Sequence, residues 1–233
     1  MATTSISLIR EQSEAVNPPR ALWVPFALGR PLGSAEDPEF QKNVMRSAFD
    51  LLETATEPTI ADYPHEAPNE AGPGTWACPL NLPVADDPSH TGRLLAEVAR
   101  LQPWADETRT ARGRTLFGAT GAKPDQVTEV ARALSSIADT GNIELPDSDV
   151  EWAIAMPLLV RHLADDLRTF YHEAISAQPG DAAPNHDALN QWIFADTVLG
   201  DVLQTVARHL DASDNGEDKL VRRFLIPEGH YQP

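Results

Sequence analysis

A buried strand that runs through a glycine loop into a capped helix constrains the first sixty residues of this chain most strongly. Residues 21–26 form an almost continuous apolar run, which is the pattern of a strand buried on both faces. A loop at residues 29–33 follows, and Asp37 and Pro38 then provide the N-cap and the first residue of a helix. With residues 59–61 as the next strand, the sequence predicts a strand–helix–strand unit with parallel strands.

Most of the remaining chain shows the 3.6-residue apolar period of amphipathic helices. We expect these helices at residues 88–101, 124–139, 147–176, 185–210 and 219–225. The helix at 124–139 has the clearest pattern, and Gly141 is expected to end it. Pro157 is expected to kink the helix at 147–176, because proline lacks the amide hydrogen of the helical ladder.

The predicted fold class is therefore α+β, mostly α. A small parallel β/α unit at the N-terminus is followed by a bundle of four to five helices. The sequence predicts a βαβ element at residues 1–63, a connection rich in proline and glycine at 64–87, and a helical domain at 88–233. A chain of 233 residues is long enough for one large domain or two small ones.

The formal net charge of −17 narrows the classes of partner. It repels phosphate backbones and anionic lipids, so we expect neither nucleic acid nor a membrane as a partner. The chain has no apolar run near 18 residues, and its first nine residues lack the pattern of a signal peptide. We expect a cytoplasmic protein that associates with another protein or with a second copy of itself. A basic group at Arg109, Arg112 and Arg114 could contact an acidic partner or another copy of the protein, and the alternative is a solvated loop.

Cys78 is the single cysteine of the sequence. One cysteine excludes an internal disulfide, a C-x-x-C redox pair and a cysteine-rich metal site. A nucleophilic role would require a helix N-terminus, a cation or a histidine that lowers the thiol pKa. His65 and His90 are the nearest histidines in the sequence, and they fall in a predicted loop and at a predicted helix start. A buried, inert thiol is the commoner role, so Cys78 is a weak catalytic candidate.

Gly29, Arg30 and Gly33 form a candidate anion-binding or ligand-binding loop. Backbone amides in a glycine loop and the start of a helix attract anions, and the Arg30 guanidinium could hold a carboxylate or phosphate in a bidentate pair. The alternative is that both glycines only provide positive φ angles in a tight connection. Asp37 favours that alternative, because its carboxylate already occupies the helix cap.

His162, Asp166 and Asp196 are the other weak candidates for a catalytic site. Asp196 falls between apolar positions of the predicted last helix, where an unpaired carboxylate costs on the order of several kcal/mol. His162 and Asp166 are one turn apart on the preceding helix, so the three side chains meet if the two helices pack antiparallel. Such a cluster could bind a metal or hold a proton, and the alternative is a structural polar pair. Because the Glu-x-x-His repeats of a dimetal bundle are missing, we predict no metal site, and the sequence requires no cofactor.

One segment of the chain resembles a known family. Its residues are the runs PPRALWVPFALGRPLG at 18–33 and DPEFQ at 37–41. A strand that enters a G-x-P-x-G type loop, followed by a helix capped near a DP…Q element, is similar to the C-terminal end of protein B (selenoprotein B) of the glycine, sarcosine, betaine and D-proline reductases. The resemblance covers residues 3–55, about a quarter of the chain.

The resemblance implies a shared piece of fold without the chemistry of the family. The reductases use selenocysteine or cysteine, with a nearby C-x-x-C element, upstream of this C-terminal part. This chain has neither there, and Cys78 follows the matched segment, so no catalytic residue carries over. The expected function is a non-catalytic subunit or companion of a protein B-like reductase system, and not an enzyme on its own.

A second hypothesis for the function stays open. Under this hypothesis the protein is a small-molecule-binding protein or an enzyme. Its site would lie between the loop of Gly29 and Gly33 and the helices that carry His162, Asp166 and Asp196.

Overall fold

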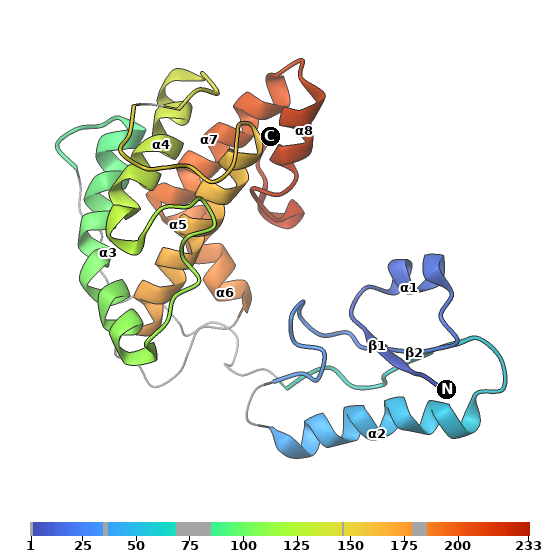
Figure 1. The fold of residues 1–233 in the computed structure, drawn as a ribbon. Helices are drawn as coiled ribbons and strands as arrows, with labels where there is room; N and C mark the ends of the chain where they lie inside the picture. The colour runs from blue at the N-terminus through green and yellow to red at the C-terminus, as the bar shows by residue number, and fades with distance from the viewer. Residues whose placement is uncertain (1, 35–36, 69–84, 146, 179–185) are drawn as a thin grey trace. The chain divides into compact units, whose positions relative to one another are not determined.

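The computed structural model describes residues 2–34, 37–68, 85–145, 147–178 and 186–233. The chain divides into two compact units, Met1–Thr75 (unit 1) and Trp76–Pro233 (unit 2). The division falls within residues 64–87, where the sequence suggests a connection. Unit 1 holds a small sheet and unit 2 is helical (Figure 1), so the described fold is α+β and mostly α, as predicted.

The described residues of unit 1 form a three-stranded parallel sheet with two helices. Its elements are β1 (Ser5–Ser7), α1 (Arg10–Val16), β2 (Arg20–Trp23), α2 (Pro38–Thr54) and β3 (Thr59–Asp62). The strands lie in the order β1-β2-β3, and Ala21 of β2 pairs with Ser5 on one side and with Ile60 on the other. The parallel pairing of β2 and β3 confirms the predicted strand–helix–strand unit.

The core of unit 1 lies between β2 and α2. Leu22 and Val24 are buried on the sheet side, and Val44 and Ala48 are buried on the helix side. The α2 helix begins where the sequence predicts, because the Asp37 carboxylate accepts a hydrogen bond from the Phe40 amide at 3.1 Å. The apolar run and the capping pair therefore fix both layers of this unit.

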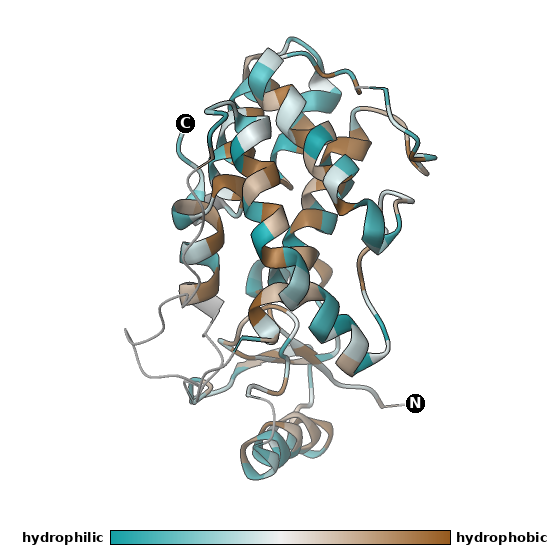
Figure 2. Ribbon diagram, turned by 90° about the vertical axis from the view of Figure 1, so that its left-hand side faces the viewer, coloured by the Kyte–Doolittle hydropathy of each residue, from teal (hydrophilic) through white to brown (hydrophobic). Residues whose placement is uncertain are grey.

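Unit 2 is a helical bundle. Its helices are α3 (His90–Arg112), α4 (Val127–Thr140), α5 (Leu158–Ser176), α6 (His186–Gln191), α7 (Val198–Ala212) and α8 (Gly216–Arg222). The long helices α3, α4, α5 and α7 pack on one another around a single hydrophobic core. Figure 2 shows hydrophobic and hydrophilic stretches alternating along these helices, as amphipathic helices require. Within the described residues, no helix combines the length and the apolar character needed to cross a bilayer.

The α3 helix is longer than the sequence predicts. Its N-cap is Ser89, and the predicted end at residue 101 is wrong, because the helix runs through Pro103 to Arg112. The reason is packing: Leu101, Ala105 and Thr108 continue the buried face beyond the proline. Tertiary contacts here outweigh the hydrogen bond that Pro103 cannot donate.

The predicted helices at residues 147–176 and 185–210 are both wrong in their bounds. Pro157 does not kink a helix, since α5 begins only at Leu158. The last long helix is interrupted by a π-helical segment, Trp192–Asp196, and by extended backbone at Thr197. The Thr197 hydroxyl donates to the carbonyl oxygen of Ile193 at 2.7 Å and accepts from the Gly200 amide at 3.0 Å. One side chain therefore closes the first segment and caps α7.

Candidate functional site

The glycine loop of unit 1 is built from two closed turns. Gly29 and Gly33 have φ angles of +87° and +85°, as expected for glycines in tight turns. The Arg30 amide donates to the carbonyl of Ala27 at 3.0 Å, and the Gly33 amide donates to the carbonyl of Arg30 at 2.9 Å. Asp37 caps α2. These contacts favour the turn-forming role of both glycines, since the amides of Arg30 and Gly33 already donate to carbonyl oxygens within the loop.

Asp196 does not lie on the buried face of a helix. Its side chain is exposed, so the expectation of a costly buried carboxylate at this position is wrong. The physical reason is the helix break: the π-helical segment and the extended Thr197 change the direction in which residues 192–196 face. A continuous 3.6-residue period through residue 210 does not describe this segment.

Asp166 is completely buried and serves a loop. Its carboxylate accepts the amide hydrogens of Gly118 and Ala119, each at 2.8 Å, and of Thr120 at 3.1 Å. It also accepts the Thr120 hydroxyl at 2.6 Å. Four donors satisfy both carboxylate oxygens, so Asp166 holds the loop between α3 and α4 rather than a metal or a substrate.

His162 and Cys78 complete the predicted candidates. The Nδ1 atom of His162 is buried and makes no hydrogen bond within the described residues. The four bonds of Asp166 go to the 118–120 loop and none goes to His162. Cys78 lies outside the described residues. Within the part of the chain that the structure describes, no group of three or more His, Cys, Asp or Glu side chains could hold a metal ion.

Arg109 belongs to α3 and not to a solvated loop. Its Nε donates to a carboxylate oxygen of Glu173 at 2.6 Å, and the other oxygen accepts the Thr115 hydroxyl at 2.6 Å. The guanidinium also stacks near the rings of Phe117 and Phe170, at 5.4 and 5.6 Å from their centroids. A nearly buried ion pair with two aromatic neighbours is a structural link between α3 and α5.

Glu97 is a buried carboxylate that the sequence reasoning missed. It accepts the hydroxyl of Tyr171 and the amide hydrogen of Val198, the latter at 3.0 Å. Burial raises the pKa of Glu97, against the lowering effect of these hydrogen bonds. Burial and the nearby carboxylate raise the pKa of Tyr171 well above its usual value. A usable signal existed, because Glu97 lies three residues after Leu94 and four before Leu101, on the buried face.

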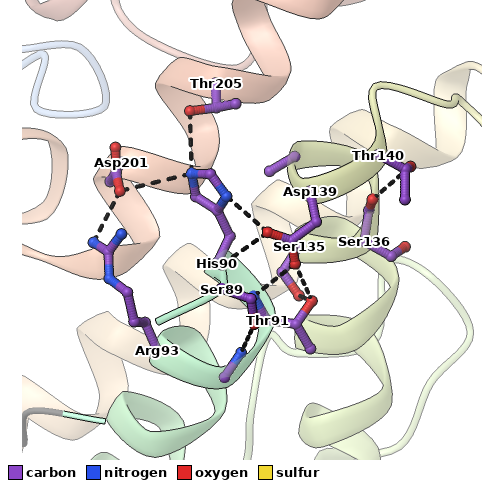
Figure 3. A network of polar contacts seen from close by, with 12 residues as sticks. Ser89, His90, Thr91, Arg93, Ser135, Ser136, Asp139, Thr140, Asp201 and Thr205 are labelled. Atoms are coloured by element: carbon purple, nitrogen blue, oxygen red, sulfur yellow. Dashed lines mark hydrogen bonds and ion pairs between the residues drawn. The ribbon is translucent and has the colours of Figure 1, made fainter. Parts of the chain in front are cut away.

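His90 lies in the most elaborate polar cluster of unit 2 (Figure 3). Asp139 of α4 accepts the backbone amides of His90 and Thr91 at 2.8 and 3.0 Å and the Thr91 hydroxyl at 2.7 Å. The same carboxylate lies 2.8 Å from His90 Nδ1. Partial burial opposes ionisation of Asp139, but these hydrogen bonds outweigh it and lower the pKa of Asp139. Asp139 is therefore a carboxylate that caps α3 from a neighbouring helix.

The other ring nitrogen of His90 faces α7. Its Nε2 lies 3.5 Å from the Thr205 hydroxyl and 3.8 Å from a carboxylate oxygen of Asp201. Arg93 pairs with the same Asp201 oxygen at 2.9 Å. Because the Asp139 carboxylate accepts, Nδ1 carries the hydrogen of this bond, and the orientation of the ring turns Nε2 toward Thr205 and Asp201. A carboxylate, an oriented imidazole and a hydroxyl in series can accept and return a proton.

A second feature of unit 2 is an open hollow of about 510 Å³ at the ends of α4 and α7. Residues 141–144, His209 and Ser213 form most of its lining. His209 Nε2 lies 3.3 Å from the carbonyl oxygen of Ala138, at the end of α4. The imidazole thereby satisfies a terminal helix carbonyl, which is a structural role.

Comparison with known proteins gives no match for this chain, whether against protein-family models, curated proteins or solved structures.

Proposed function

We propose that the protein is a non-catalytic subunit or companion of a protein B-like reductase system, and that unit 1 contacts the partner. The resemblance over residues 3–55 supports the choice of partner. The absence of a second cysteine from the sequence supports a non-catalytic role. The observation that carries the proposal is the form of the sheet.

In the part of unit 1 that the structure describes, the sheet is a small parallel fragment whose two outer strands each pair on one side. Within the described residues β1 pairs only with β2, and β3 pairs only with β2. Parallel sheets are normally covered on both faces and rarely stand alone in so small a form. Unpaired strand edges present free backbone donors and acceptors to another chain. A protein partner that extends or covers this sheet would satisfy them.

The outer face of α2 adds an apolar surface to unit 1. Met45 and Phe49 lie one turn apart and are 40% and 53% exposed, whereas Val44 and Ala48 face the core. Fully burying a side chain of this size stabilises an interface by roughly 1.5–3 kcal/mol. The two residues therefore form a contact surface on the resembling segment itself.

Co-expression with a protein B-like reductase subunit from the same genome tests the proposal. The wild-type chain is expected to co-purify with that subunit. The double variant Met45→Glu with Phe49→Glu is expected to weaken the complex at least about tenfold, a change of about 1.4 kcal/mol.

Leu116→Glu is the matched control, because Leu116 is 85% exposed in unit 2. It should leave the complex intact. A wild-type chain that stays alone at micromolar concentrations of both proteins would refute the proposal. A stable homodimer that the double variant disrupts would assign the same surface to a second copy of the chain.

A second candidate is a small-molecule-binding protein or enzyme, and the geometry of His90 favours this site over the one around Asp196. His90 is oriented by Asp139, and about a quarter of its side chain is exposed (26%). A thermal-shift screen of small molecules should yield a ligand whose effect disappears in His90→Gln. The effect should persist in His172→Gln, which changes an exposed histidine of α5. A ligand whose thermal shift is unchanged by both substitutions would count against a site at His90.

A further inference from the structure

Gln204 of α7 holds the backbone of the last residues of the chain. Its Nε2 donates to the carbonyl oxygen of His230 at 2.7 Å, and its Oε1 accepts the amide hydrogen of Gln232 at 3.0 Å. A residue in a parallel β-strand makes this pair of bonds with residues i and i+2 of its neighbour. The nearly buried carboxamide of Gln204 therefore imitates one residue of an adjacent strand.

Tyr231, the residue between the two clamped positions, has its own contacts. Its hydroxyl donates to a carboxylate oxygen of Asp211 at 2.5 Å, and the Arg222 guanidinium lies 3.9 Å from the ring centroid. Arg222 and Asp211 are joined by an ion pair of 2.9 Å. The charged pair thus contacts both the face and the hydroxyl of the tyrosine.

A third contact comes from Arg208, one turn after Gln204 on α7. Its Nη1 donates to the carbonyl oxygen of Gln232 at 3.4 Å. Together Gln204, Arg208, Asp211 and Arg222 form one continuous set of contacts, which we call the Gln204 surface. The C-terminus lies beside α7 and α8 in Figure 1.

The Gln204 surface has the composition of a site that recognises extended peptides. Backbone hydrogen bonds from a fixed side chain are independent of sequence, and a side-chain site between them adds selectivity. The bound segment lies at the surface, where another chain can reach it: Leu225 and Ile226 before it are buried, whereas Gln232 and Pro233 are exposed.

We propose that the Gln204 surface is a docking site for an extended protein segment that carries a tyrosine, and that residues 230–232 occupy it in cis until such a segment replaces them. The partner segment presents a backbone carbonyl before the tyrosine and a backbone amide after it. This site is separate from the contact surface of unit 1 and does not depend on the proposed function. The attached segment competes at an effective concentration on the order of millimolar, so the surface is regulated by its own occupant.

The test uses the full chain and a fluorescent peptide of residues 227–233, PEGHYQP. The variant Tyr231→Ala weakens the resident segment and leaves the surface unchanged. It is expected to bind the peptide at least about tenfold more tightly than the wild-type chain does. A peptide with the same Tyr231→Ala change should not bind. Equal binding to both chains, or no binding by the variant, would overturn the proposal.

Gln204→Leu in the Tyr231→Ala background should abolish peptide binding, and Gln102→Leu on α3 is the control that should preserve it. If Tyr231→Ala fails to fold, amide exchange in the wild-type chain decides instead. The Gln232 amide is expected to exchange faster than the Val206 amide in the middle of α7. Equal protection of the two amides would show that the segment does not detach from the folded protein, and the proposal would fail.

Discussion

Glu97 on α3 accepts the phenolic hydrogen of Tyr171 on α5, and both groups are buried in the core of unit 2. The carboxylate also accepts the amide hydrogens of Val198 and Leu199 at the start of α7. Three helices therefore meet at one side chain. A buried polar cluster of this kind is costly to leave half satisfied, because each unpaired group keeps its desolvation penalty.

Removing the Tyr171 hydroxyl should destabilise the protein. Tyr171→Phe takes one donor from Glu97 and leaves the ring in place, so the expected loss in the free energy of unfolding is about 1–3 kcal/mol. Urea unfolding followed by circular dichroism measures it. Tyr63→Phe is a matched control, because Tyr63 is also buried but belongs to the core of unit 1. An equal loss in both variants would contradict the special role of this hydroxyl.

Glu97 should make stability depend on pH in a defined direction. Burial raises its folded-state pKa above the usual value of 4.5, so the folded protein binds the proton more tightly than the unfolded chain. The contribution of Glu97 is then fully present below pH 4.5 and is lost as the pH rises through the folded-state pKa. Glu97→Gln removes this dependence. The difference in unfolding free energy, variant minus wild type, should increase with pH above 4.5, and a flat difference would show that the pKa is not raised.

Asp166 and its neighbour Asp165 should differ sharply on substitution. Asp166→Ala leaves three amides and one hydroxyl of the 118–120 loop without an acceptor, so a loss of about 3–5 kcal/mol is expected. Asp165→Ala breaks half-exposed ion pairs with Arg161 and Arg168 and should cost at most about 1 kcal/mol. Amide exchange of Gly118 and Ala119 should accelerate only in the Asp166 variant. Similar losses at both positions would contradict the assigned role.

Two helical glycines should respond oppositely to alanine. A Cβ at Gly200 would lie 2.5 Å from the carbonyl oxygen of Ile193 and 2.7 Å from that of Phe194, both of them backbone atoms. Gly200→Ala should therefore lower the melting temperature by several degrees, in spite of the better helix propensity of alanine. A Cβ at Gly216 meets nothing within 4 Å, and Gly216→Ala should stabilise by about 0.4–1 kcal/mol. Stabilisation by both substitutions would mean that α7 does not pack on the preceding segment in this way.

Asp139 should support the start of α3 in an acid-sensitive manner. Asp139→Ala removes a cap shared by two amides, with an expected cost of about 0.5–2 kcal/mol. Because its folded-state pKa is lowered from 3.8, the stabilisation is complete above pH 3.8 and is lost as the pH falls through the lowered pKa. Glu107→Ala, at an exposed position of α3, is the control that should have little effect. An Asp139 variant with the wild-type acid transition would exclude this role.

Local signals in the sequence were sufficient for much of the fold. Asp37 and Pro38 mark the start of α2, and Gly141 marks the end of α4, in the structure as in the prediction. The apolar run at residues 21–26 indicated β2, which the structure places at Arg20–Trp23. Each of these signals acts through a residue's own conformational preference or through a contact within one turn.

Structural features that depend on contacts between residues far apart in the sequence could not be predicted from such local signals. The continuation of α3 past Pro103 requires the neighbouring helices that bury its far end. The break at Thr197 requires the carbonyl of Ile193 and the close approach of Gly200. Asp196 looked buried because a continuous helix was assumed.

The candidate site shows the same limit. The Asp139 carboxylate meets His90 across 49 residues of sequence, and no local pattern marks such a pair. Asp166 was singled out because it lies one turn after His162, where it could meet Asp196. The sequence did not indicate that its partners are the amides of a loop.

The hydrogen bonds of Glu97 also have a consequence for the order in which the protein folds. Its bonds to Tyr171 and Val198 join residues 74 and 101 positions apart, so they close long loops and gain nothing until most of the bundle has assembled. During folding, the amides in the first turn of α7 should therefore become protected from hydrogen exchange late, together with the whole of unit 2. The slow exchange of the Val198 amide would then report the global unfolding of this unit rather than the fraying of a single helix end.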